Sequence, residues 1–372
     1  MRRAVVLCAL FACSKTNDAT SAPPPDASIP DAAAPIDAGQ PPTCVDHLVA
    51  PTIVDPVKSN ELVVMNDPEA KLGIFDPNLV STVALSYSAV KAKDDIETRI
   101  AVSSDEGMTW TYATTASPAV PAPNDSGNLI HETSSLVVDP DEPDASRRWK
   151  LFTHRYLAKG GDLHYDVGNI ALQTAPAPGG PWSTPTANIG WRGASPFSSD
   201  GAVLLAEDAP GASDCVFFTE PSALTLPNGV LALTLGCVTS LPSIRVVLFF
   251  SRDHAASWTS VGTLVPAKDG ACLGRSPGLV RVNAASLFSE NGKLYVWLTP
   301  ESATGYHGCA SVEVTDLDTL TLARNPDGSP TVTRLLTTPP DQFSGACTSA
   351  EGKTLMSIAF LADARPFRIF AP

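Results

Sequence analysis

The chain has little charge, few basic residues and no long apolar run. Only 17% of its 372 residues are charged, and 25 Lys and Arg stand against 39 Asp and Glu, so the formal net charge is -14. A nucleic-acid binder needs a basic face to displace counterions, so this balance argues against nucleic acid as a partner. After the first dozen residues no window holds 18 consecutive apolar residues, and the sequence therefore predicts no membrane-spanning helix.

Several chemical signatures are also missing. No C-x-x-C pair occurs, which argues against a structural zinc site, and we expect no metal and no other cofactor. No G-x-S-x-G occurs either, and Gly274–Gly278 resembles one only superficially because it contains a proline, so a serine hydrolase is disfavoured. No segment keeps a 3.6-residue apolar period beyond two turns, which excludes a mainly helical fold.

The N-terminus has the pattern of an export signal. Basic Met1–Arg3 is followed by a short apolar run, which predicts a signal peptide over residues 1–12. The run ends in Leu10–Cys13, which resembles the bacterial lipobox, where cleavage precedes the cysteine and Cys13 carries lipid. Ser14 rather than Asp follows, and by resemblance to Gram-negative sorting this favours the outer membrane. An ordinary secretory signal is the alternative.

A tether and one folded domain are expected to follow. Residues 13–43 hold the lipidated cysteine and a Pro-, Ala- and Asp-rich linker with little to bury, so we predict a disordered tether. We expect an exported lipoprotein, periplasmic or at the cell surface, whose domain over residues 44–372 is a monomer that meets the membrane only through its lipid. Export makes disulfides plausible, with fifteen possible pairings and buried free thiols as the alternative, among Cys44, Cys215, Cys237, Cys272, Cys309 and Cys347.

From about residue 45 the pattern is all-β. Short apolar runs alternate with Gly, Pro, Asn and Asp turns. Ser103–Trp110 has the form Ser-x-Asp-x-Gly-x-Thr-Trp, Ser251–Trp258 repeats it with Ala for Gly, and Ala175–Trp182 keeps only Gly and Trp. Such an Asp accepts backbone hydrogen bonds in a tight turn. The motif resembles the Asp-box of sialidases and related propeller proteins, which implies an outer-rim position and a structural role for Asp105 and Asp253.

A second repeated element indicates the number of blades. Five segments lead into strong strands at intervals of roughly 60 to 90 residues, which suits four-stranded blades of about 40–50 residues with loop insertions. The segments are Phe75–Val80, His131–Val137, Thr219–Leu224, Val282–Phe288 and, as the weakest, Ser344–Thr348. We therefore predict an all-β, five-bladed β-propeller, with six blades as the alternative if residues 45–70 or 190–215 build another. The innermost strands of a propeller converge on an axial pocket.

In this register three acids take the same position in successive blades: Asp76, Glu132 and Glu220. Like charges and partial burial separate the pKa values of such carboxyls, so one serves as base or nucleophile and another as acid, as glycosidic bond cleavage requires. The set resembles that of five-bladed arabinanase/xylosidase and invertase glycosidases. The resemblance implies Asp76 as nucleophile or base, Glu132 as the pKa-tuning carboxylate and Glu220 as the acid. The second-blade Glu departs from the usual Asp.

A rival assignment comes from the sialidases. Glu220–Gly229 resembles the sialidase segment whose Glu activates a Tyr nucleophile. A sialidase also needs three arginines around the sugar carboxylate, but the next strand ends in Leu235–Cys237 where an Arg would be expected. Arg275 and Arg281 leave the set incomplete, so the sequence disfavours sialidase activity.

Four further residues are candidates for binding the sugar: His131, His154, Arg155 and Arg275. Lone histidines are more often structural, and a carboxylate before Pro or Ser often only caps a turn. The acidic run Asp139–Asp144 favours a solvated turn over a weak calcium site. The main hypothesis is a carbohydrate-active propeller, a glycoside hydrolase if it is an enzyme. The alternative is a non-catalytic surface lipoprotein that binds glycan or protein.

Overall fold

The computed structural model describes residues 43–372, apart from 68–70, 124, 194, 241–242, 340–341 and 361. The predicted signal, Cys13 and nearly all of the tether lie outside the described residues. The described part contains five short 3-10 helices, and none of them is long and apolar enough to cross a bilayer.

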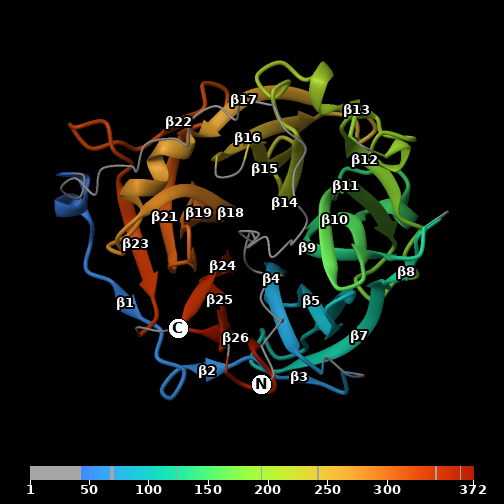
Figure 1. Cartoon of the computed structure of the whole chain (residues 1–372), viewed down its shortest axis with the longest axis horizontal. Helices are drawn as coiled ribbons and strands as arrows, with labels where there is room; N and C mark the ends of the chain where they lie inside the picture. Colours follow the sequence, from blue (N-terminus) through green and yellow to red (C-terminus); the bar gives the residue numbers. More distant parts are fainter. Residues whose placement is uncertain are drawn as a thin grey trace, which may run out of the picture.

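Five antiparallel blades surround one axis, as the repeat predicted (Figure 1). Blade 1 comprises β4 (Gly73–Ser81), β5 (Ala84–Ala92), β6 (Asp95–Val102) and β7 (Trp110–Ser117). Blade 2 comprises β9 (Asn128–Val138), β10 (Trp149–Lys159), β11 (Asp162–Ala175) and β12 (Thr186–Gly190). Blade 3 comprises β14 (Phe217–Thr225), β15 (Leu231–Ser240), β16 (Ser243–Ser251) and β17 (Thr259–Val265). Blade 4 comprises β18 (Leu279–Glu290), β19 (Lys293–Ser302), β21 (Cys309–Asp316) and β23 (Val332–Thr337). Blade 5 comprises β24 (Phe343–Ala350), β25 (Lys353–Ala359) and β26 (Phe367–Ala371).

Residues 52–65 form a strap along the outside of three blades and not a sixth blade (Figure 1). Its strand β1 (Thr52–Ile53) pairs with β23 of blade 4, and β3 (Val64–Met65) pairs with β7 of blade 1. Between them β2 (Asn60–Glu61) pairs with β26 of blade 5, which has only three longer strands. The ring is therefore closed by an N-terminal segment beside the C-terminal strand, which leaves no open sheet edge at this junction.

Every inner strand carries the same irregularity, which we call the axial bulge. In each blade two residues of the inner strand stand opposite one residue of the second strand. The first bulge residue always has a positive φ: Asp76 (47°), Thr133 (50°), Glu220 (51°), Ala284 (43°) and Ala346 (49°). A bulge re-aims side chains and bends the strand. All five blades share this bulge, so the strained backbone is a feature of the propeller architecture. The blades differ in which residue type occupies the bulge.

Hydrogen bonds next to the bulges join neighbouring blades. A side-chain oxygen just after each of four bulges accepts a hydrogen bond from a backbone N–H of the next inner strand. The pairs are Thr348 with Leu79 (3.1 Å), Asn78 with Leu136 (2.7 Å), Ser135 with Ala223 (2.8 Å) and Ser222 with Leu287 (3.0 Å). The remaining junction, between blades 4 and 5, is bridged by the disulfide Cys309–Cys347. The inner strands are thus held in a fixed register around the axis.

Two other disulfides, Cys44–Cys272 and Cys215–Cys237, use the remaining predicted cysteines. Three disulfides indicate folding in an oxidising compartment.

Two of the three Trp motifs, Ser103–Trp110 and Ser251–Trp258, form matching turns at the rim, between the third and fourth strands of blades 1 and 3. Asp105 accepts the backbone N–H of Thr109 at 2.9 Å, and Asp253 accepts that of Ser257 at 2.9 Å.

Candidate active site

The three predicted acids converge on the axis. The five axial bulges line a cavity of about 30 Å³, and Asp76 and Glu220 are among its lining residues. Glu132 lies directly before the bulge of blade 2, and its charge reaches Asp76. Asp76 is 6% exposed and Glu132 is 1% exposed, whereas Glu220 is only partly buried. Glu220 is therefore the acid that solvent reaches first.

The register places Glu132 one residue away from the position predicted for it. The bulge residue of blade 2 is Thr133, so Thr133 is the counterpart of Asp76 and Glu220. Glu132 pairs with His154 as Phe75 pairs with Ser88 in blade 1. Asp76 and Glu220 occupy the first position of the bulge, whereas Glu132 occupies the position before it. The prediction that all three acids share one structural position is therefore wrong.

The three carboxyls hold their protons more tightly than isolated carboxyls do. Burial, and then the charges of Glu220 and Glu132, raise the pKa of Asp76 well above its usual range. Burial also raises the pKa of Glu132, although a hydrogen bond from Tyr156 opposes it. Burial and the charge of Glu301 raise the pKa of Glu220 to about 8. Such displaced values are typical of functional sites.

Two tyrosines connect Glu132 with the mouth of the site. The Tyr156 hydroxyl donates a hydrogen bond to Glu132 Oε2 and is also hydrogen-bonded to Tyr165. Tyr156 is fully buried, whereas Tyr165 is partly exposed. The charges of Glu132, Glu220 and Asp76 all add to the effect of burial in raising the pKa of Tyr165. Its phenol therefore lies over the three acids.

An insertion in blade 2 sets the position of Tyr165. Tyr156 pairs with Gly168, but the next residue of β10 pairs with His164, so residues 165–167 protrude. The Tyr165 carbonyl lies 3.2 Å from Nε2 of His154. The Asp166 carbonyl accepts a hydrogen bond from the indole N–H of Trp191 at 2.8 Å. Buried side chains thus fix the protruding residues.

Blade 4 contributes a second polar group to the site. Arg281 binds the carboxylate of Glu301 through two of its nitrogens. The Asn283 amide donates to Glu301 Oε2 at 3.4 Å and to the Tyr306 hydroxyl at 2.9 Å. The charges of Glu220 and Glu301 both raise the pKa of Tyr306, so this group borders the three acids. The guanidinium is already occupied by a protein carboxylate.

The predicted sugar-binding residues do not meet at the axis. Successive residues of a strand face opposite sides, so His131 and Arg155 point away from the side that carries Glu132 and Tyr156. Burial and the nearby Arg155 lower the pKa of His131 to about 3. Arg155 lies over the Phe197 ring and donates to the Pro185 carbonyl at 3.2 Å.

The other two predicted binders hold backbone segments. His154 shares the face of Glu132, and burial lowers its pKa to about 3, so it is neutral and acts through its contact with the Tyr165 carbonyl. Arg275 is exposed and donates to the Leu48 carbonyl at 2.9 Å, beside the Cys44–Cys272 disulfide. Neither is placed to touch a ligand in the axial cavity.

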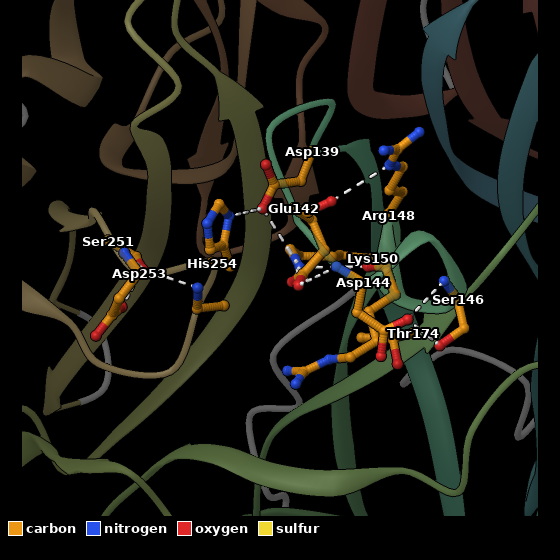
Figure 2. A network of polar contacts seen from close by, with 12 residues as sticks. Asp139, Glu142, Asp144, Ser146, Arg148, Lys150, Thr174, Ser251, Asp253 and His254 are labelled. Atoms are coloured by element: carbon orange, nitrogen blue, oxygen red, sulfur yellow. Dashed lines mark hydrogen bonds and ion pairs between the residues drawn. The ribbon is translucent and has the colours of Figure 1, made fainter.

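The acidic run Asp139–Asp144 is a solvated turn only in part, because Asp141 and Asp144 are exposed and the other two acids are buried. Asp139 is fully buried and Glu142 is 4% exposed, and both bind the ammonium of Lys150, which is itself fully buried (Figure 2). His254 Nδ1 lies 2.9 Å from Asp139 Oδ2. The ammonium stands between the carboxylates that could hold a metal ion and neutralises them, although Asp139 Oδ1 accepts no hydrogen bond in the described structure.

A larger cavity of about 960 Å³ lies between the strap and blade 5, bordered by residues such as Leu62, Leu355 and Pro372. It contains none of the predicted site residues. Trp191 and Trp297 are both fully buried.

Comparisons with known proteins support the architecture. No protein-family model matches the chain, and no curated protein sequence matches it. Among solved structures, the chain is similar to a Bacillus subtilis family 43 arabinoxylan arabinofuranohydrolase, with 14% identity, a TM-score of 0.50, and coverage of 82% of this chain and 64% of that one.

Two further structures are similar at lower scores. A family 117 glycoside hydrolase from Zobellia galactanivorans shows 12% identity, a TM-score of 0.49, and coverage of 84% of this chain and 89% of that one. A Hadza microbial sialidase shows 16% identity, a TM-score of 0.47 and coverage of 77% of this chain. The chain spans only 53% of the length of that sialidase. At these identities the likeness shows the fold alone.

Proposed function

We propose that this protein is a carbohydrate-active propeller that hydrolyses a glycosidic bond at the mouth of the axial cavity. The observation that carries the proposal is the convergence of Asp76, Glu132 and Glu220 from three blades, each with a raised pKa. Structures that are similar in fold belong to glycoside hydrolases, which supports the choice of reaction.

Glu220 is suited to the role of general acid. Its pKa of about 8 keeps it protonated at neutral pH, and its partial exposure lets it reach a leaving-group oxygen. Asp76 lies deeper and is suited to the role of base or nucleophile once it loses its proton. Glu132, bound by Tyr156, orients and tunes the other two.

The cavity limits how the substrate enters. A volume of about 30 Å³ exceeds the roughly 10–15 Å³ that one water molecule needs but is too small for a whole sugar ring. The reacting sugar must therefore lie at the mouth, beside Glu220 and Tyr165. Such a closed end favours attack at a chain terminus, an exo mode of action.

The test is sugar release from arabinan, xylan, fructan and sialoside panels. We expect turnover by the unmodified protein and a loss of at least a hundredfold in Glu220→Gln, because a general acid contributes about 10²–10⁴-fold. Glu106→Gln, at an exposed rim residue, is the matched control and should retain activity. No turnover on any panel, with glycan binding unaffected by Glu220→Gln, would exclude the enzyme.

A non-catalytic glycan-binding propeller is the second candidate. The observation that favours it is that burial raises the pKa of all three acids, so none is ionised in readiness for attack. Glycan binding that is weakened by Glu220→Gln, without turnover, would select this function.

The cellular setting is part of the same proposal. Export, lipid attachment at Cys13 and an outer-membrane or surface position are supported by the N-terminal sequence, and the three disulfides agree with an oxidising compartment. Metabolic labelling with a fatty acid, compared between the full chain and Cys13→Ala, tests the anchor.

A further inference from the structure

The three axial acids lack a cation. Asp76 and Glu132 each keep a buried oxygen, Oδ2 and Oε1, that accepts no hydrogen bond in the described structure. No Lys or Arg among the described residues lowers the pKa of any of the three acids. Arg281, the cation nearest to this set in blade 4, is occupied by Glu301. While these carboxyls keep their protons they are neutral, but once ionised they only accept hydrogen bonds, and the set then needs a donor that carries positive charge.

The cavity fixes the size of that donor. Its volume of about 30 Å³ exceeds the roughly 10–15 Å³ that one water molecule needs in a cavity but leaves room only for a small group. Two hydroxyls that line it, those of Thr133 and Ser286, also lack hydrogen-bond partners in the described structure. The cavity therefore presents carboxyl and hydroxyl oxygens, among apolar alanine and proline side chains, to a group as small as an ammonium.

The mouth of the cavity suits a sugar ring. Tyr165 and Glu220 are both partly exposed, and the charge of Glu220 reaches Tyr165. The rings of Tyr165 and of partly exposed Phe217 each stack on His154. Aromatic faces pack against the apolar face of a sugar and also attract cations. A ligand that combines a ring with a small cationic group would match both the mouth and the cavity.

We propose that the axial site recognises an amino sugar with a free ammonium group, held by Asp76 and Glu132, while the sugar ring lies against Tyr165 and Glu220 remains the acid. This inference rests on the proposed function, because it names the substrate class of the same site. Two N–H donors of an ammonium match the unpaired oxygens of these two carboxyls, and the third can meet the hydroxyl of Thr133 or Ser286. A sugar carboxylate would find no free guanidinium among the described axial residues, which disfavours sialic acid.

The proposal also explains how Asp76 can become an ionised base although burial raises its pKa. A bound ammonium lowers the pKa of nearby carboxyls, because an opposite charge within about 4–6 Å favours the ionised form. Asp76 would then lose its proton when the substrate binds. The substrate itself would thus activate the base, and neutral sugars would not.

The test compares D-glucosamine with N-acetyl-D-glucosamine and D-glucose by ligand-observed NMR titration of the full propeller. We expect D-glucosamine to bind at least tenfold more tightly than its N-acetyl counterpart, which has no charge. Asp76→Asn should remove that preference, so that D-glucosamine binds no more tightly than D-glucose. Asp318→Asn, at an exposed turn residue, is the matched control and should keep the preference. Glu132→Gln serves as a second variant, and the comparison of ligands on the unmodified protein remains decisive if either variant fails to fold.

Three results would overturn the inference. Equal binding of the three sugars would overturn it and leave the proposed function intact. Equal binding of methylammonium or Ca²⁺ and D-glucosamine would show a bare cation site. No binding of any sugar, together with no turnover on the glycan panels, would overturn both the inference and the proposed function.

Discussion

Two sets of buried carboxylates in the molecule differ in whether a protein cation neutralises them. At the junction of blades 2 and 3, Lys150 places its ammonium 2.8 Å from Glu142 Oε2 and 3.3 Å from Asp139 Oδ2 (Figure 2). Burial alone would raise the pKa of Glu142, but the hydrogen bond and charge of Lys150 outweigh it and the pKa is lowered. On the axis, the pKa values of Asp76 and Glu132 are raised.

The difference shows which set serves structure and which serves binding. An internal ammonium neutralises the Lys150 set, which keeps one unpaired oxygen, Asp139 Oδ1. The axial set has two unpaired carboxyl oxygens and no such cation, at the one place where all five blades meet. Buried unpaired acids destabilise a fold. Their presence on the axis is therefore expected only if a ligand uses them.

The largest effect should follow from removing the internal ammonium. Lys150→Met leaves Asp139 and Glu142 buried without a cation, which should lower the free energy of unfolding by about 3–5 kcal/mol. Urea denaturation followed by tryptophan fluorescence measures the change. Lys159→Met is the control, because Lys159 is half exposed and its ion pair with Asp125 lies at the surface; we expect a change below about 1 kcal/mol. Equal stability of the two variants would contradict the contrast.

The axial set should respond in the opposite direction. The folded pKa of Glu220, about 8, lies above the unfolded value of about 4.3, so the unfolded state releases its proton first as pH rises. The unmodified protein should thus lose stability between about pH 4 and pH 8. Glu220→Gln lacks this loss and should be more stable than the unmodified protein at pH 8, by on the order of 2 kcal/mol after allowance for partial exposure.

Glu142→Gln is the matched variant with the opposite sign. Because the folded pKa of Glu142 is lowered, its stabilisation is present above the unfolded pKa and disappears as pH falls through the folded value. It should therefore destabilise the protein at pH 7 and have little effect at the lowest pH at which the fold persists. Unfolding curves of both variants over the same pH series decide the point. Parallel pH profiles for the two variants would remove the distinction between the two sets.

Much of the fold was predictable because the axial bulge repeats. A strand that bends in the same way five times calls for turn-forming residues at five places, and the Pro that follows Asp76 and Glu220 marks two of them. Blade 2 has no such Pro, so aligning acid with acid shifted Glu132 by one residue. The alternation of strand residues also shows that His131 and Glu132 could not both face the axis.

The rest of the site depends on tertiary detail. Tyr165 reaches the axis because residues 165–167 protrude from a hairpin, and no periodicity reveals such an insertion. The pairing of Glu301 with Arg281 could have been predicted from the sequence. Counting outward from the Asn291-Gly292 turn places it almost opposite Arg281, and opposite charges on paired strands attract. The burial that raises the pKa of the acids arises only when five blades close around them.

The smallest change in stability should follow from replacing His254, which contacts the Lys150 set. His254 joins that set from the rim turn of blade 3, with Nδ1 2.9 Å from Asp139 Oδ2 and a φ of 62°. His254→Asn keeps a residue that tolerates this φ but removes the contact with Asp139. We expect a loss of about 1 kcal/mol in the free energy of unfolding, since Lys150 still neutralises Asp139. The double variant with Lys150→Met should lose less or more than the sum of the two changes, because both act on the same carboxylate. Strict additivity would mean that His254 lies beside the set without belonging to it.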